Sequence, residues 1–151
     1  MARGFNYAPG ASDDVEQAAA PALQRSRIAA LVQSRNAVVR EVLAARSDLG
    51  LGQMATLAHD RSAQVRTALA ANPAAAPSVL EHLAGDRHVP VLVALLGNPA
   101  TPPDVAERLS SHRKSEVRTA AASRMDGHAG GSRPTPIARA APVGESVPPQ
   151  A

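Results

Sequence analysis

The chain has 151 residues, a length typical of a single domain, and its 16 basic and 13 acidic side chains leave a net charge of +3. The absence of cysteine excludes disulfides and thiolate metal sites, and because only Phe5 and Tyr7 are aromatic, a core must consist of alanine, valine and leucine. No apolar segment approaches the roughly 18 residues of a membrane span, and the first residues lack a signal peptide's apolar stretch, so we expect a soluble, cytoplasmic protein.

Residues 1–20 form a polar stretch without hydrophobic periodicity, and we expect them to be a flexible N-terminal segment. A strict repeat follows this segment. Valine recurs every 26 residues, at Val39, Val65, Val91 and Val117. Leucine recurs at the same period, at Leu31, Leu57, Leu83 and Leu109. A period of this length is typical of stacked supersecondary units.

The predicted repeat domain covers residues 21–126. It divides into full units at residues 35–60, 61–86 and 87–112, between half-units at residues 21–34 and 113–126. In the second unit, Ser62–Ala71 carries Val65 and Leu69 at helical spacing, with Asp60 or Ser62 as the expected N-cap. Pro73 ends this helix, because proline disfavours the helical conformation of the residue before it.

A second, shorter helix is predicted in each unit, at Ser78–Ala84 in the second and at Pro103–Ser110 in the third. Helices this short are not stable alone, so neighbouring units must stack to bury their apolar faces. We therefore expect an all-α fold, a short α-solenoid of about four helical pairs. Residues 127–151 are rich in Pro, Gly and Ala, and we expect this tail to be disordered.

The string VRTALAANPAAAPSVLEHLAGD, at Val65–Asp86, resembles the leucine-rich repeat variant family and is similar to HEAT-like repeats. The resemblance extends over Pro21–Asp126 and is loosest at both ends of that range. It implies a right-handed superhelix of helical units. One known member of the family carries a cysteine-ligated iron–sulfur cluster, which this cysteine-free chain has no ligands to hold.

Two columns of arginine follow the repeat. The first stands directly after the valines, at Arg40, Arg66 and Arg118, with Leu92 in the third unit. We favour a structural ladder in which each arginine pairs with the aspartate that closes the previous unit, as Asp60 precedes Arg66 and Asp86 precedes Leu92. The other interpretation is a basic ladder for phosphates or acidic peptides.

The second arginine column opens each unit, at Arg35, Arg61, Arg87 and Arg113. We expect these residues to be exposed along one edge of the stack. They are candidates for a row that binds phosphates, although a solvated edge weakened by Asp60 and Asp86 is the simpler interpretation.

The third unit is the most apolar, because Leu92, Val93 and Leu96 replace polar or small residues of the other units. A helix that is apolar on all sides is either fully buried or presents a contact surface. These three residues are therefore candidates for binding a protein partner or a second copy of the chain. The alternative is that a neighbouring segment covers them.

No motif for catalysis or cofactor binding is recognisable, and the histidines lack the spacing of a metal site. We therefore expect no enzyme, no cofactor and no metal. The sequence predicts a non-catalytic scaffold for protein–protein interaction, with a protein partner or a homodimer. The alternative function is binding of duplex DNA, a nucleic acid, through the arginine columns.

Overall fold

The computed structural model describes residues 11–129, and this part of the chain is all-helical, which confirms the predicted fold class. The helices are α1 (Ala11–Ala19), α2 (Arg25–Val32), α3 (Ala37–Ala44), α4 (Leu51–Ala58), α5 (Ala63–Ala71), α6 (Pro77–Leu83), α7 (Val89–Gly97), α8 (Pro103–Leu109) and α9 (Ser115–Ala129). No described helix is long and apolar enough to cross a membrane.

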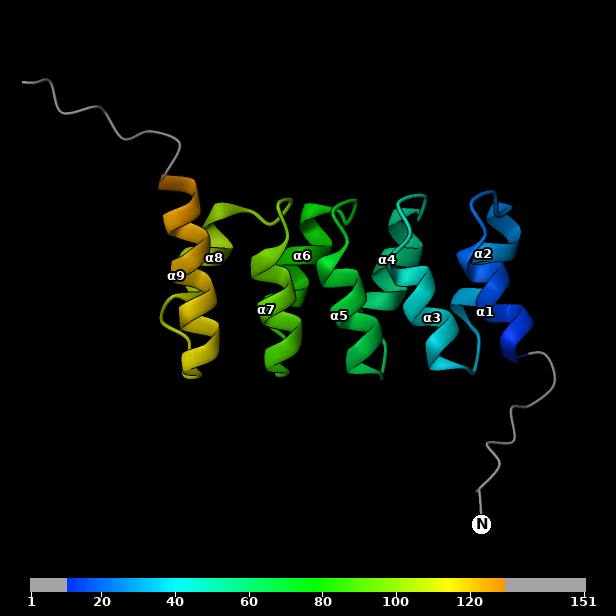
Figure 1. Cartoon of the computed structure of the whole chain (residues 1–151), viewed down its shortest axis with the longest axis horizontal. Helices are drawn as coiled ribbons and strands as arrows, with labels where there is room; N and C mark the ends of the chain where they lie inside the picture. Colours follow the sequence, from blue (N-terminus) through cyan, green and yellow to red (C-terminus); the bar gives the residue numbers. More distant parts are fainter. Residues whose placement is uncertain (1–10, 130–151) are drawn as a thin grey trace, which may run out of the picture.

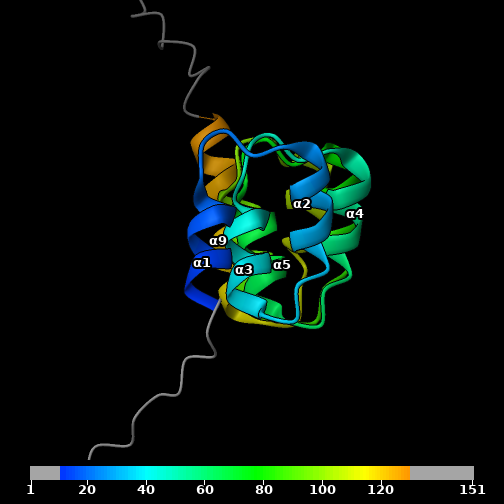
Figure 2. The same cartoon turned by 90° about the vertical axis from the view of Figure 1, so that its right-hand side faces the viewer.

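The helices stand in two rows (Figure 1). The odd-numbered helices form one row, in which α1, α3, α5, α7 and α9 pack each against the next. The even-numbered helices form the second row behind them, as the end-on view shows (Figure 2). Each 26-residue unit thus contributes one helix to each row, and the units follow one another along the long axis of the molecule.

The repeated apolar positions form the core between the rows. Val39, Val65, Val91 and Val117 are fully buried on the odd helices. The leucines of the second column, from Leu31 to Leu109, are buried on the even helices. Alanine at Ala44 and Ala70 keeps neighbouring odd helices close together. The core is continuous along the stack because each unit covers the apolar face of its neighbour.

The helix boundaries agree with the sequence to within one residue. The predicted helix at Ser62–Ala71 begins at Ala63, and the helix predicted at Ser78–Ala84 runs over Pro77–Leu83. Neither Asp60 nor Ser62 makes the expected cap bond within the first turn of α5. Instead, the Asp60 carboxylate accepts a hydrogen bond from the backbone N–H of Ser62 at 2.8 Å.

Both ends of the repeat domain differ from the prediction. Helix α1 lies within the segment expected to be flexible, and it packs against α3 with Ala18 fully buried. The valine period did not reveal it, because Asp13 stands 26 residues before Val39. Helices α1 and α2 therefore form a complete pair where a half-unit was predicted. Helix α9 continues to Ala129, and the remaining tail lies outside the described residues.

Candidate anion-binding edge

Arginines of the first column form buried ion pairs. The guanidinium of Arg40 donates to both carboxylate oxygens of Asp60, at 2.6 and 2.9 Å, and each side chain is only 7% exposed. Arg66 binds Asp86 in the same way, at 2.6 and 3.3 Å. The fork of the guanidinium matches the carboxylate, so each pair holds the end of one odd helix to the loop that leads into the next.

The direction of this pairing differs from the prediction. Each arginine pairs with the aspartate 20 residues after it, and Asp60 offers Arg66 only its backbone carbonyl, at 2.5 Å. Arg118 makes the corresponding backbone bond, to the carbonyl of His112 at 2.9 Å. The predicted pairing of Arg66 with the Asp60 carboxylate is wrong, because that carboxylate points back toward the arginine of the preceding odd helix.

The 20-residue offset is visible in the sequence once it is known. The third unit lacks both members of the pair, since Leu92 replaces the arginine and His112 replaces the aspartate. This joint replacement is the signal that could have identified the correct partners. We call the ion pairs Arg40–Asp60 and Arg66–Asp86, with their backbone bonds, the ion-pair ladder.

The ion-pair ladder keeps its aspartates ionised. Burial opposes ionisation of Asp86, but hydrogen bonds from Arg66 and from the backbone N–H of His88 outweigh it and lower its pKa to about 2. Asp60 is held below its ordinary pKa by the same balance, in which bonds from Arg40 and the Ser62 N–H exceed the effect of burial. Their negative charges are thus neutralised inside the ladder.

A second ladder, which the sequence reasoning missed, joins the other ends of the odd helices. The side chains at positions 46, 72, 98 and 124 each donate to backbone carbonyls of residues 28 and 26 positions earlier. Asn98, for example, donates to Ala70 and Asn72 at 2.7 and 2.8 Å. Arg46 and Arg124 occupy the outer positions of this carbonyl ladder, and Asn72 and Asn98 occupy the inner ones. The signal for it was a polar donor recurring every 26 residues.

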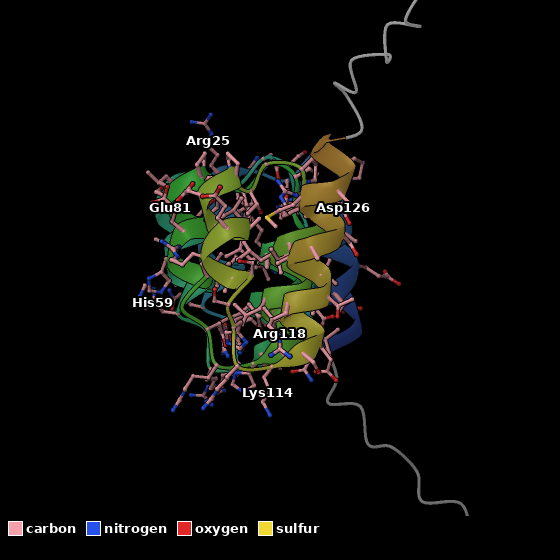
Figure 3. The ribbon with its side chains drawn as sticks, turned by 90° about the vertical axis from the view of Figure 1, so that its left-hand side faces the viewer. Arg25, His59, Glu81, Lys114, Arg118 and Asp126 are labelled. Carbon is pink, nitrogen blue, oxygen red and sulfur yellow. The ribbon has the colours of Figure 1, made fainter. Side chains whose placement is uncertain are left out.

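The second arginine column is exposed, as predicted, and lies on one edge of the stack. We define the basic edge as Arg35, Arg61, Arg87 and Arg113, which stand in the loops that lead into α3, α5, α7 and α9. In the described part of the chain, none of the four forms an ion pair with a carboxylate. Lys114 and Arg118 lie at the same end of the bundle, opposite to Arg25 and Glu81 (Figure 3).

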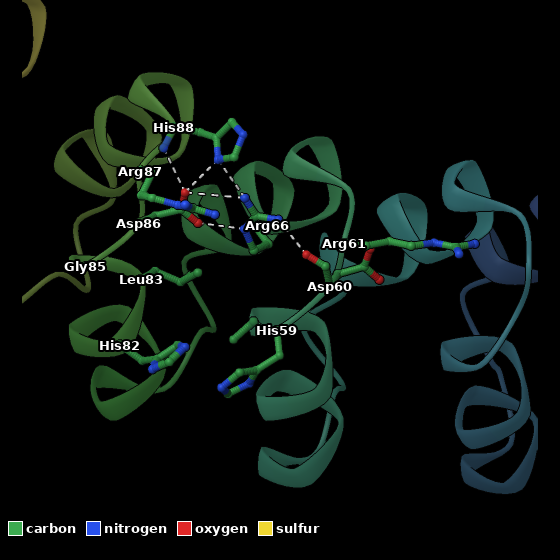
Figure 4. A pocket seen from close by; sticks show the side chains of 11 residues that line it. His59, Asp60, Arg61, Arg66, His82, Leu83, Gly85, Asp86, Arg87 and His88 are labelled. Carbon is green, nitrogen blue, oxygen red and sulfur yellow. Dashed lines mark hydrogen bonds and ion pairs between the residues drawn. The ribbon is translucent and has the colours of Figure 1, made fainter.

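Three hollows follow one another along the basic edge. The first, of about 330 Å³, is lined by Arg35 and Arg61. The second, of about 610 Å³, is lined by Arg61 and Arg87, and the third, of about 750 Å³, by Arg113. In the second hollow, the rings of His59 and His82 stand 4.3 Å apart, away from the ion pair of Arg66 and Asp86 (Figure 4).

The described side chains form no group of three or more histidines and carboxylates that could hold a metal ion. His59 and His82 face each other at the second hollow, and His88 contacts the Asp86 carboxylate instead, at 3.0 Å. The side chain of His128 lies outside the described residues. What the edge offers chemically is therefore a set of guanidinium and imidazole donors suited to an anion.

The apolar third unit does not form the predicted contact surface. Leu92 and Leu96 are 1% and 2% exposed, so they belong to the core, and only Val93 is accessible at 40%. Leu92 occupies the buried place that Arg40 has on α3, and Leu96 the place of Ala44. Helix α7 packs between α5 and α9, which explains why it is apolar on most sides. The proposal of a partner site at Leu92 and Leu96 is wrong.

Comparison with models of protein families, with curated proteins and with solved structures finds no match to this chain. The resemblance of Val65–Asp86 to the leucine-rich repeat variant family therefore stays a prediction. The function must be inferred from the geometry of the stack and of its exposed edge.

Proposed function

We propose that the chain is a non-catalytic scaffold that binds an acidic segment of a partner protein along its basic edge. The observation that supports this function is the row of four exposed arginines, one for each unit, without carboxylate partners among the described residues. Asp60 and Asp86, which would weaken the row, are already paired with Arg40 and Arg66. The edge is thus more positive than its sequence indicates.

Binding of duplex DNA is the second candidate, because regularly spaced arginines also suit phosphates. The charge of the whole stack favours a protein. Residues 11–129 contain 13 basic and 12 acidic side chains, a net charge of +1. A nearly neutral surface gives little long-range attraction for a polyanion, whereas a short acidic segment needs only the local field of the edge.

Charge reversal at the edge tests the proposal. Binding of a fluorescein-labelled polyglutamate peptide is measured by fluorescence anisotropy for the native chain, for Arg87→Glu and for Arg25→Glu. Both arginines are exposed, but Arg25 lies at the opposite end of the bundle (Figure 3). We expect Arg87→Glu to weaken binding about tenfold, or about 1.4 kcal/mol, and Arg25→Glu to leave it unchanged.

Circular dichroism checks that each variant folds, and Arg87→Ala, which adds no charge beside Asp86, replaces Arg87→Glu if the latter unfolds. Equal weakening by the Arg87 and Arg25 variants would contradict a specific edge. The same titration with a labelled DNA duplex at low and high salt decides between the candidates. Duplex binding that is tighter than peptide binding and falls steeply with salt would replace the proposed function by the second candidate.

A further inference from the structure

The arginines of the basic edge repeat once for each unit. Each stands in the loop that leads into an odd helix, and the odd helices pack side by side in one row (Figure 1). Packed helices lie about 8–10 Å apart. An anionic segment that contacts every arginine must therefore present one carboxylate about every 8–10 Å, always on the same side.

Few backbone conformations meet this spacing. In a β-strand, side chains on one face recur every second residue, about 6.6 Å apart, which is too short. In a polyproline-II helix, three residues complete one turn and each advances about 3.1 Å, so every third side chain returns to the same side after about 9 Å. An α-helix returns to nearly the same side after seven residues, or about 10.5 Å, which is slightly too long.

The edge itself favours an extended ligand over a helix. The three hollows follow one another from Arg35 to Arg113, so they offer a path along the loops instead of a deep apolar groove. An α-helical ligand anchors itself by an apolar face in such a groove. Polyproline-II needs no backbone partner, and its preformed conformation reduces the entropy lost on binding.

We propose that the acidic segment binds as a polyproline-II stretch with a carboxylate at every third residue, one for each arginine of the basic edge. This inference rests on the proposed function and specifies its ligand. Four carboxylates at this period span about ten residues, so a short unstructured segment of a partner suffices. Residues between the carboxylates point away from the arginines, and proline at those positions stabilises the conformation.

Peptides of identical composition test the spacing. Isothermal titration of the full chain compares a peptide in which glutamate precedes two prolines in every triplet with a permuted peptide in which the glutamates are contiguous. We expect the triplet peptide to bind about tenfold more tightly. The preference should disappear in Arg61→Ala with Arg87→Ala and persist in Arg25→Ala, since Arg25 lies off the edge.

The outcomes separate this inference from the proposed function. Equal affinity for the triplet and contiguous peptides overturns the three-residue spacing while leaving an acidic ligand in place. Tighter binding of a helical peptide with glutamate at every seventh residue overturns the polyproline-II conformation. Absence of binding by every acidic peptide overturns the proposed function together with the inference.

Discussion

The Asp86 carboxylate is almost completely buried, and its ionised form depends on hydrogen bonds that exist only in the folded chain. Its pKa of about 2 lies below the ordinary value of 3.8. The unfolded chain therefore binds more protons than the folded chain between these values. The resulting stabilisation is complete above pH 4 and is lost as the pH falls toward 2. We expect the free energy of unfolding to decrease by roughly 2 kcal/mol over this range from Asp86 alone.

Urea denaturation at a series of pH values measures this decrease. Asp86→Asn is expected to lower the stability at pH 7 and to flatten the dependence between pH 4 and 2. Asp104→Asn removes an exposed carboxylate of α8 and should keep the dependence of the native chain. An unchanged dependence in Asp86→Asn would show that Asp86 is not the source of the effect.

At the scale of residues, the sequence predicts roles better than partners. The structural role of Arg40 and Arg66 and the exposure of Arg87 follow from their places in the repeat. The partner of Arg66 does not, because both Asp60 and Asp86 lie within reach along the chain and only the stacking direction decides between them. The amides of Asn72 and Asn98 bind carbonyls, and carbonyls leave no mark in the sequence.

Helix α7 shows what composition cannot decide at the scale of an element. We expect Leu92→Ala to lower the free energy of unfolding by about 2–5 kcal/mol, because it leaves a cavity in the core. Val93→Ala, one residue further along the same helix, should cost less than about 1 kcal/mol, since this side chain is partly exposed. Urea denaturation of the two variants makes the comparison.

A small effect of Leu92→Ala on stability, together with the loss of a dimer in sedimentation, would restore the contact surface that the structure argues against. The sequence could not distinguish the two cases, because an all-round apolar helix reads the same whether neighbours cover it or not. Helix α1 shows the converse difficulty. Its Asp13 breaks the valine pattern, yet the helix still packs against α3 through Ala18.

The whole molecule is held by ladders that have one gap, at Leu92 and His112. Placing the missing pair there tests whether the ladders stabilise the stack. Leu92→Arg alone buries an unpaired charge and should cost about 3–5 kcal/mol. Adding His112→Asp supplies the partner found in the other units, so we expect the two substitutions to couple favourably by about 1–3 kcal/mol.

A double-mutant cycle in urea denaturation measures this coupling, with His112→Asp alone as the fourth corner. Strictly additive effects would mean that the backbone around α7 does not present the geometry of Arg40–Asp60 and Arg66–Asp86. The all-α class follows from the period alone because every unit repeats the same apolar positions. The local strength of the stack does not, because it depends on the pairs that individual units lack.

The carbonyl ladder has a consequence for how such a chain lengthens. Each of its donors reaches only the carbonyls of the unit directly before it, so no bond measures the total number of units. A tandem duplication of the gene segment encoding residues 61–86 would add a block that carries its own donor, its own acceptor and its own edge arginine. Such a descendant would gain valency for a longer acidic ligand without any new kind of contact.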